Sequence, residues 1–229
     1  MRQPDWDIVR ALPLFCDMNE TNFNKLTTAA VLHSFPQHVK LITEGNLPDF
    51  LHILIQGSVE MFCSHDGHET TIDIMAPTTT FILAAVIRDD AYLSSARTLT
   101  TSQIISISAR SVRDVFGRDF AFARAVVDEL AERYCTAVRS RKNEKLRTSA
   151  ERLANWILHA GALQGDQRVV ELAFGKRTLA ASLGMTPENL SRSLARLTCY
   201  GVRLSGRDIV IEDSLALERF AKPNALIDG

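Results

Sequence analysis

The segment of residues 178–197, TLAASLGMTPENLSRSLARL, constrains the fold more than any other part of the chain. Gly184 suits a tight turn between two short helices, because glycine adopts positive φ most easily. Ala180 is small enough for those helices to cross closely. Thr186 is a natural N-cap, and Pro187 suits the first helical position because its missing N–H would have no partner there. The segment therefore predicts a helix-turn-helix whose second helix presents its N-terminal end.

The polar face of this second helix has a chemical meaning at a DNA surface, since the N-terminal end of such a helix enters the major groove. Arg192 can form a bidentate bond to guanine, Glu188 can accept from a cytosine amino group, and Ser191 can contact a neighbouring base. Phosphate contacts position a module without reading sequence, and they require basic or hydroxyl side chains. We assign that role to Lys176, Arg177, Thr186 and Arg196.

The flanking segments extend this motif to a winged helix. Residues 168–174, RVVELAF, predict a strand before the first helix, and residues 201–213, GVRLSGRDIVIED, predict a hairpin after the second. Residues 139–210 carry 13 Lys or Arg against six Asp or Glu, whereas the remainder carries 13 against 21. This split indicates a basic module that meets an anionic partner. Ser193 disagrees with the pattern, because it stands where an apolar core residue is expected.

Residues 28–110 predict a β-barrel or sandwich. Short strand-like runs recur there between turn residues, and Asp66-Gly67 is a good signal for a two-residue hairpin. The runs are VKLIT (39–43), FLHILIQG (50–57), VEMFCS (59–64), TTIDIM (70–75) and SQIISIS (102–108).

From residue 111 onward the hydrophobic pattern becomes helical. Five positions alternate in steps of three and four, which is typical of a coiled-coil seam and indicates a dimer. The seam residues are Val127, Leu130, Tyr134, Ala137 and Arg141. A helix that packs on its own barrel is the alternative, since the seam lasts only two heptads.

Several functional classes lack the required sequence features. The longest apolar run, FILAAVI at residues 81–87, is too short to span a bilayer, and the charged N-terminus lacks the apolar core of a signal peptide. We therefore expect a cytoplasmic protein with no membrane contact. The four cysteines are scattered and predict free thiols. There is no P-loop, Rossmann fingerprint or catalytic-triad motif, so we expect no enzyme.

The order of these parts resembles the Crp/Fnr superfamily of bacterial transcription regulators. The resemblance runs from about Val9 to Ile211 and includes EGNLPDFLHILIQGSVEMF at residues 44–62. It implies an α+β fold with an N-terminal cyclic-nucleotide-binding-type β-barrel (jelly roll), a long dimerisation helix and a C-terminal winged helix-turn-helix. We place these parts at residues 1–118, 119–146 and 147–229.

The resemblance also implies a DNA site and partners. Glu188, Ser191 and Arg192 match the E-x-x-S-R pattern of the Fnr branch, whose members recognise a TTGAT-N4-ATCAA palindrome. In the cyclic-AMP branch an arginine precedes the glutamate, where this chain has Pro187. A homodimer on double-stranded DNA is implied, with RNA polymerase as a further partner. A small effector in the barrel is implied to re-orient the reading helices.

The cyclic-nucleotide binders of this superfamily use a Gly-Glu pair for the ribose and an Arg-Ser pair for the cyclic phosphate. Here the glutamate is replaced by Ile82 or Leu83 and the arginine by Tyr92 or Leu93. A buried phosphate would lack its countercharge, which is costly, so cyclic AMP is not the expected effector. An iron–sulfur cluster needs four cysteine ligands, and only Cys16 lies in the N-terminal region, so we expect none.

What remains resembles the Dnr/Nnr nitric-oxide-responsive group, whose members are thought to bind haem in the barrel. The resemblance implies an apolar effector pocket, which we place at Phe81, Leu83, Val86 and Tyr92. Candidate axial ligands are His33, His38, His52 and His159.

Two alternatives stay open. One is a regulator that depends on a cyclic nucleotide. The other is a cupin-like metal-binding protein, because an Asp66-Gly67 turn would set His65 opposite His68 within reach of one metal ion. Cys63 and Glu69 lie beside that histidine pair in the sequence.

Overall fold

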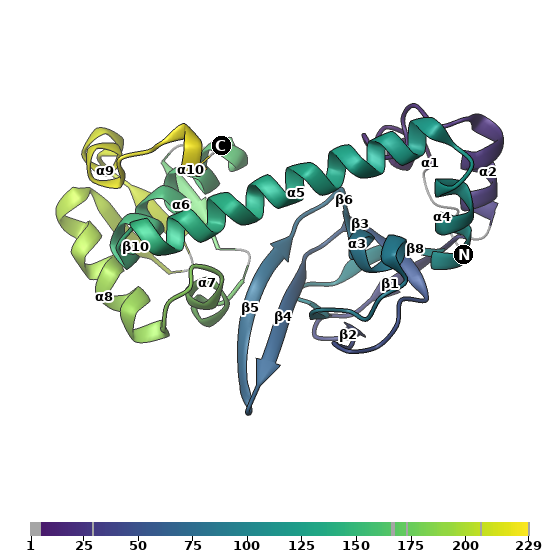
Figure 1. Cartoon of the computed structure of the whole chain (residues 1–229). Helices are drawn as coiled ribbons and strands as arrows, with labels where there is room; N and C mark the ends of the chain where they lie inside the picture. The colour runs from purple at the N-terminus through teal and green to yellow at the C-terminus, as the bar shows by residue number, and fades with distance from the viewer. Residues whose placement is uncertain (1–5, 29, 166–167, 173, 207, 229) are drawn as a thin grey trace. The chain divides into compact units, whose positions relative to one another are not determined.

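The chain divides into two compact units, residues 1–134 and residues 135–229 (Figure 1). The computed structural model describes residues 6–28, 30–165, 168–172, 174–206 and 208–228. Helix α5 (Phe120–Leu146) begins in the first unit and ends in the second. Each unit is described below by itself.

The first unit contains two antiparallel sheets, with strand orders β1-β8-β3-β6 and β2-β7-β4-β5 in its described part. The strands are β1 (Ala30–Phe35), β2 (Lys40–Ile42), β3 (Phe50–Gln56), β4 (Val59–His65), β5 (His68–Met75), β6 (Thr79–Phe81), β7 (Ser95–Thr98) and β8 (Ser102–Ser108). Its further helices are α1 (Trp6–Arg10), α2 (Glu20–Thr28), α3 (Leu83–Arg88) and α4 (Ala109–Phe116). The expected β-barrel domain is therefore present, and residues 83–88 form a helix within it.

Period-two alternation along β3 separates two hydrophobic clusters. Leu51 and Ile53 belong to a helix-facing cluster, which the sheet shares with α2, α4 and the first turns of α5. Leu54 and Ile104 belong to an interior cluster between the two sheets. Because successive strand side chains point to opposite faces, one strand serves both clusters.

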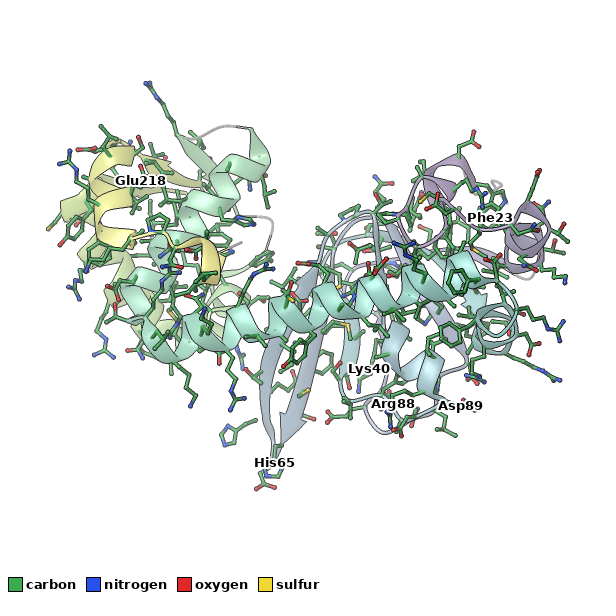
Figure 2. The ribbon with its side chains drawn as sticks, turned by 45° about the horizontal axis from the view of Figure 1, so that its top comes forward. Phe23, Lys40, His65, Arg88, Asp89 and Glu218 are labelled. Atoms are coloured by element: carbon green, nitrogen blue, oxygen red, sulfur yellow. The ribbon has the colours of Figure 1, made fainter. Side chains whose placement is uncertain are left out.

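The hairpin of β4 and β5 has the expected two-residue turn. His65 pairs with His68 across Asp66-Gly67, and both turn residues have positive φ, 49° and 77°. Two positive φ values are the signature of a type I′ turn, whose twist matches that of paired strands. Figure 2 labels His65 at the tip of this hairpin.

The second unit has the expected order of strand, helix, turn, helix and hairpin. Its elements after α5 are α6 (Ser149–Gln164), β9 (Val169–Glu171), α7 (Lys176–Ser182), α8 (Pro187–Leu197), the 3₁₀ turn η1 (Thr198–Tyr200), β10 (Val202–Ser205), β11 (Asp208–Ile211), α9 (Ser214–Ala221) and α10 (Ala225–Asp228). The strands form an antiparallel sheet in the order β10-β11-β9. A capping box between Thr148 and Glu151 starts α6.

Helix α5 leaves an apolar stripe exposed. Phe120, Val127 and Tyr134 are 85%, 60% and 72% exposed and follow one another in steps of seven residues. Leu130, which the sequence placed in the same seam, instead packs partly buried against the helix-facing cluster. Ala137 and Arg141 are exposed. Four of the five expected seam residues are therefore exposed, whereas Leu130 is used by the barrel's own core.

Two turn glycines of the barrel, Gly45 and Gly57, test how much the stability of the fold depends on the absence of a side chain at a tight turn. A Cβ on Gly57 would lie 2.5 Å from the carbonyl oxygen of Thr101, whereas a Cβ on Gly45 would meet nothing within 4 Å. Both residues have positive φ. We expect Gly45→Ala to lower the free energy of unfolding by about 1 kcal/mol, from backbone strain alone. Gly57→Ala adds a steric clash and should lower it by about 3 kcal/mol. Equal losses in urea unfolding would contradict this difference.

Candidate DNA-binding surface and effector domain

The turn between α7 and α8 is built from local hydrogen bonds. The N–H of Gly184 donates to the carbonyl of Ala181 over 2.9 Å, and the N–H of Met185 donates to that of Ala180 over 2.9 Å. Gly184 has a φ of 62°, as the turn requires. The Thr186 hydroxyl accepts from the N–H of Asn189 over 3.2 Å and caps α8. The predicted cap and turn residues thus occupy the expected places.

One face of α8 is buried in the core of the second unit. This face comprises Leu190, Ser193, Leu194 and Leu197. It packs with Leu179 and Ala180 of α7 in a cluster that also includes residues of α6 and of the sheet. Ser193 is buried, so it occupies a core position as a small polar residue. Its burial fixes the opposite face of the helix as the exposed one.

That opposite face carries the three expected reading residues, Glu188, Ser191 and Arg192, all of them exposed. The Arg192 guanidinium donates to the side-chain carbonyl of Asn189. The Ser191 hydroxyl donates to the carbonyl of Pro187 over 3.0 Å. The three side chains therefore lie on one solvent-facing surface near the N-terminal end of α8.

Glu188 is a charged acceptor at neutral pH. Hydrogen bonds from its own backbone N–H and from Thr186 lower the pKa of its carboxyl group, and the nearby Arg192 lowers it further. A carboxylate can accept from a cytosine amino group but cannot donate. Asn189 was not predicted as a site residue, and it is placed to orient Arg192. Its spacing of three residues on the same helix was the available signal.

The four expected phosphate contacts are placed in three different ways. Lys176 and Arg177 are exposed in the first turn of α7. Thr186 uses its hydroxyl to cap α8. The Arg196 guanidinium lies 5.3 Å from the ring centroid of Phe220 in α9, so it has a packing contact within the domain. The first turn of α7 is therefore the most accessible basic part of this set.

The expected effector residues are buried but belong to two clusters. Phe81 and Tyr92 lie in the interior cluster, whereas Leu83 and Val86 lie in the helix-facing cluster. The reason is that Phe81 ends β6 and the next two residues of the set lie on α3. The four expected pocket residues are thus divided between the two sides of the sheet.

His52 is the most buried of the candidate histidines and lies on the interior face of its sheet. Its ring stacks on Phe81 with centroids 5.2 Å apart, and its Nδ1 lies 3.0 Å from the Ser106 hydroxyl. Burial lowers the pKa of His52 to about 4, with a smaller effect from His33, so the imidazole is neutral at pH 7. His33 and His38 are exposed, and His159 lies in the second unit.

The arginines near residues 80–99 are bound to carboxylates. Arg97 donates to Glu60 over 2.7 Å and to Glu69 over 3.0 Å. Arg88 pairs with Asp90 at 3.6 Å. Since Ala96 belongs to the interior cluster, the next side chain along β7 points to the opposite face of its sheet. Arg97 therefore faces away from the barrel interior.

The hairpin tip does not gather a metal site. In the part of the chain that the structure describes, no three His, Cys, Asp or Glu side chains come together as metal ligands. Within the same residues, no helix has the length and hydropathy needed to cross a bilayer.

The neutral state of His52 makes the stability of the barrel depend on pH. Its pKa in the folded protein is below the ordinary value of 6.5, so the unfolded chain binds the extra proton between pH 6.5 and 4. Folding stability should therefore fall as pH drops through this window, by about 2 kcal/mol at pH 5 relative to pH 7.5 for this group. Urea unfolding of His52→Gln and the parent protein at both pH values checks this, and an equal loss in the two proteins would contradict it.

Comparisons with known proteins agree with this arrangement. Residues 32–119 match the cyclic nucleotide-binding domain, and residues 151–220 match the Crp-like helix-turn-helix domain. No curated protein matches the chain.

Solved structures share the fold over most of the chain. A regulatory protein from Silicibacter pomeroyi DSS-3, described as cAMP-binding, is 25% identical, with 95% of this chain and 98% of that chain covered and a TM-score of 0.65. FixK2 from Bradyrhizobium japonicum is 20% identical, with 86% and 99% covered and a TM-score of 0.75. DNR from Pseudomonas aeruginosa is 22% identical, with 96% and 99% covered and a TM-score of 0.53.

The two matched domains follow one another in a single chain and together span more than half of it. The first contains a β-barrel with a buried hydrophobic core. The second presents the capped helix α8, whose polar face is exposed. By this combination the chain belongs to the Crp/Fnr family, as a DNA-binding transcription regulator with an effector-binding domain.

Proposed function

We propose that this regulator binds, as a homodimer, an Fnr-type palindrome of the form TTGAT-N4-ATCAA. The observation that carries the proposal is the exposed set Glu188, Ser191 and Arg192 on the first turns of α8. An arginine that presents two N–H groups to guanine is the commonest specific base contact. Lys176 and Arg177 would hold the phosphates beside it, with Thr186 and Arg196 as further contacts.

The proposed dimer uses the exposed stripe of α5, with a second copy of this chain as its occupant. Phe120, Val127 and Tyr134 repeat every seven residues and are mostly exposed, and Val138 continues the stripe four residues later. A seven-residue apolar repeat is what a two-helix seam requires. A two-fold dimer would also match the two-fold symmetry of the palindrome.

Replacing Arg192 by Ala tests base reading directly. We expect binding to the TTGAT palindrome to weaken by about 1–3 kcal/mol, while binding to scrambled DNA of the same length stays nearly unchanged. Fluorescence anisotropy at fixed salt measures both affinities. Arg219→Ala is the matched control, because Arg219 is an exposed arginine on α9 of the same unit. An equal loss on both DNAs would make Arg192 a phosphate contact.

The proposed domains are an effector domain at residues 1–118, a dimerisation helix at 119–146 and a DNA-binding domain at 147–229. RNA polymerase is the proposed protein partner, and we assign no catalytic step to the chain. The effector is proposed to be a small molecule of the barrel interior, with haem and nitric oxide as the first candidates. A haem would supply an iron that binds nitric oxide.

Among the described residues, His52 has a side chain that fits such an iron. His52 is neutral, lies on the interior face and uses its Nδ1 toward Ser106, so Nε2 is the atom that would hold the iron. Phe81 stacks on the imidazole and belongs to the packed interior cluster, so it is the side chain that has to make room.

A cyclic nucleotide is the second candidate effector, favoured by the matched domain and by the description of the Silicibacter protein. Three observations count against it. Ile82 holds a φ of 63° at the start of α3, a conformation that favours glycine, so Leu83 would stand at the place of the ribose-binding glutamate. Arg97 is bound to two carboxylates. Tyr92 is buried in the interior cluster, where it offers no charge to a phosphate.

Two titrations separate these effectors. With haem, we expect one saturable Soret band that shifts with nitric oxide and is lost in His52→Ala, whereas His33→Ala keeps it. With cyclic AMP, we expect calorimetry to show no saturable heat. Saturable cyclic-AMP binding without haem binding would replace haem by the nucleotide as the effector.

A further inference from the structure

Arg152, in the first turn of α6, is a buried cation that donates hydrogen bonds to the carbonyls of two separate segments. Its Nε donates to the carbonyl of Leu183 over 2.9 Å, and one terminal nitrogen donates to that of Gly184 over 3.1 Å. The other terminal nitrogen donates to the carbonyls of Arg147 over 2.9 Å and Glu144 over 3.4 Å. Only 8% of Arg152 is exposed, and no described residue gives it a carboxylate partner.

The two segments are the end of α5 and the turn that precedes α8. Glu144 is in the last turn of α5, and Leu183 and Gly184 form the turn of the helix-turn-helix. The last carbonyls of a helix lack intrahelical partners and carry partial negative charge, so they suit a guanidinium. The Glu144 side chain also lies 3.7 Å from where a Cβ on Gly184 would stand. One side chain of α6 thus connects α5 with the turn that starts the reading helix.

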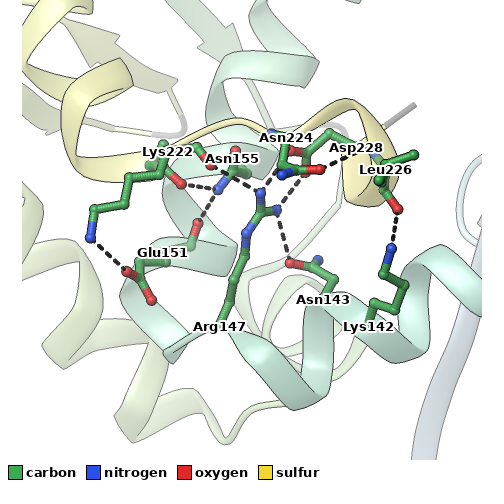
Figure 3. Close-up of polar contacts among 10 residues, drawn as sticks. Lys142, Asn143, Arg147, Glu151, Asn155, Lys222, Asn224, Leu226 and Asp228 are labelled. Carbon is green, nitrogen blue, oxygen red and sulfur yellow. Dashed lines mark hydrogen bonds and ion pairs between the residues drawn. The ribbon is translucent and has the colours of Figure 1, made fainter.

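A second arginine closes the same junction from the C-terminal side (Figure 3). The side chain of Arg147 is only 7% exposed and is held by both oxygens of Asp228, at 2.5 and 2.7 Å. It also donates to the carbonyl of Lys222 over 3.3 Å and to Asn143 of α5 over 3.2 Å. Arg147 lowers the pKa of the Asp228 carboxyl group, which keeps this pair charged at neutral pH.

The segment around α10 is fastened at two further points. Lys142 of α5 donates to the carbonyl of Leu226 over 2.7 Å, and Asn155 of α6 donates to that of Ala221 over 2.7 Å (Figure 3). The C-terminal segment therefore bonds to the last turns of α5 and to α6 on both sides of the loop that joins them. It lies beyond residue 220, where the matched helix-turn-helix domain ends.

We propose that Arg152 and Arg147, closed by Asp228, form a linkage that fixes the reading helix α8 to the C-terminal end of α5. Arg152 is its positioning residue, because it acts on α8 through the Leu183–Gly184 turn. The C-terminal segment is the clasp that keeps the α5–α6 loop in the conformation that Arg152 needs. The inference rests on the proposed function of α8 as the DNA-reading helix. It implies that α8 moves together with the last turns of α5 as one rigid unit.

The chain carries its own pair of labelling sites for a test. Cys135 on α5 and Cys199 after α8 are exposed free thiols of the second unit, and Cys16→Ser with Cys63→Ser removes the other two. Nitroxide labels on this pair, with labelled protein diluted into unlabelled full-length protein, report the α5–α8 distance within one chain by pulsed electron resonance. The measurement uses no DNA.

The variants are Arg152→Lys, which keeps the charge but loses the planar fork that reaches both segments, and Asp228→Asn, which removes the charge of the clasp. Glu212→Gln is the matched control, since Glu212 pairs with Arg203 at 2.9 Å on the exposed hairpin of the same unit. Circular dichroism and thermal unfolding first establish that each variant is folded. The Asp228 side chain is 28% exposed, so Asp228→Asn is the variant that decides the question if Arg152→Lys does not fold.

We expect one narrow distance distribution in the parent protein and in Glu212→Gln, and a distribution at least twice as wide in folded Arg152→Lys and Asp228→Asn. We also expect both variants to lose at least fivefold in preference for the palindrome over scrambled DNA. An unchanged width in both variants, or an equal broadening in Glu212→Gln, would overturn the linkage. If the parent protein shows no preference for the palindrome, the proposed DNA site fails while the distance measurement still decides the linkage.

Discussion

Arg152 carries a positive charge at a place that little water reaches, and much of the second unit is arranged around it. Burying an unpaired charge costs several kcal/mol, so the surrounding structure has to supply compensating dipoles. Carbonyls from the end of α5 and from the Leu183–Gly184 turn do this. These carbonyls can meet at one guanidinium only if α5, α6 and the turn keep their present arrangement. The charge therefore restricts where α8 can begin, and with it where Arg192 is presented.

In the barrel, the two faces of the sheet that contains β4 and β7 differ chemically, with a polar network on the outer face and apolar side chains on the inner face. Glu60 is buried on the outer side of its sheet, where Arg97 binds it over 2.7 Å and the Thr71 hydroxyl donates to it over 2.5 Å. Arg97 also lies over the ring of Phe62, 4.2 Å from its centroid. Arg97 is therefore not available to neutralise a buried phosphate. The barrel interior is lined mainly by apolar side chains, together with the neutral His52. This arrangement supports the proposal of an uncharged or metal-centred effector over a cyclic nucleotide.

The helix-turn-helix could be predicted in detail because its signals are local. A cap at Thr186, a proline at the next position and a glycine turn act within a few residues, and each was found where it was expected. Strands β1, β6 and β7 were not predicted. The sequence SART of β7 has no apolar alternation, and it forms a strand because β2 and β4 pair with it on both sides. Such pairing depends on residues far apart in the chain, which local propensity does not reveal.

The sequence by itself determined the class of each unit, the start of the reading helix and the residues on its exposed face. It could do so because helix caps and hydrophobic periods are properties of neighbouring residues. Only the tertiary structure decided that Leu130 packs on the barrel, that the expected pocket residues divide between two clusters, and that Asp228 reaches back to Arg147. These outcomes depend on which surfaces meet after the chain has folded. The physical reason is that burial and ion pairing join residues of different elements that lie far apart in the chain. A local residue pattern does not show which of these elements will be in contact.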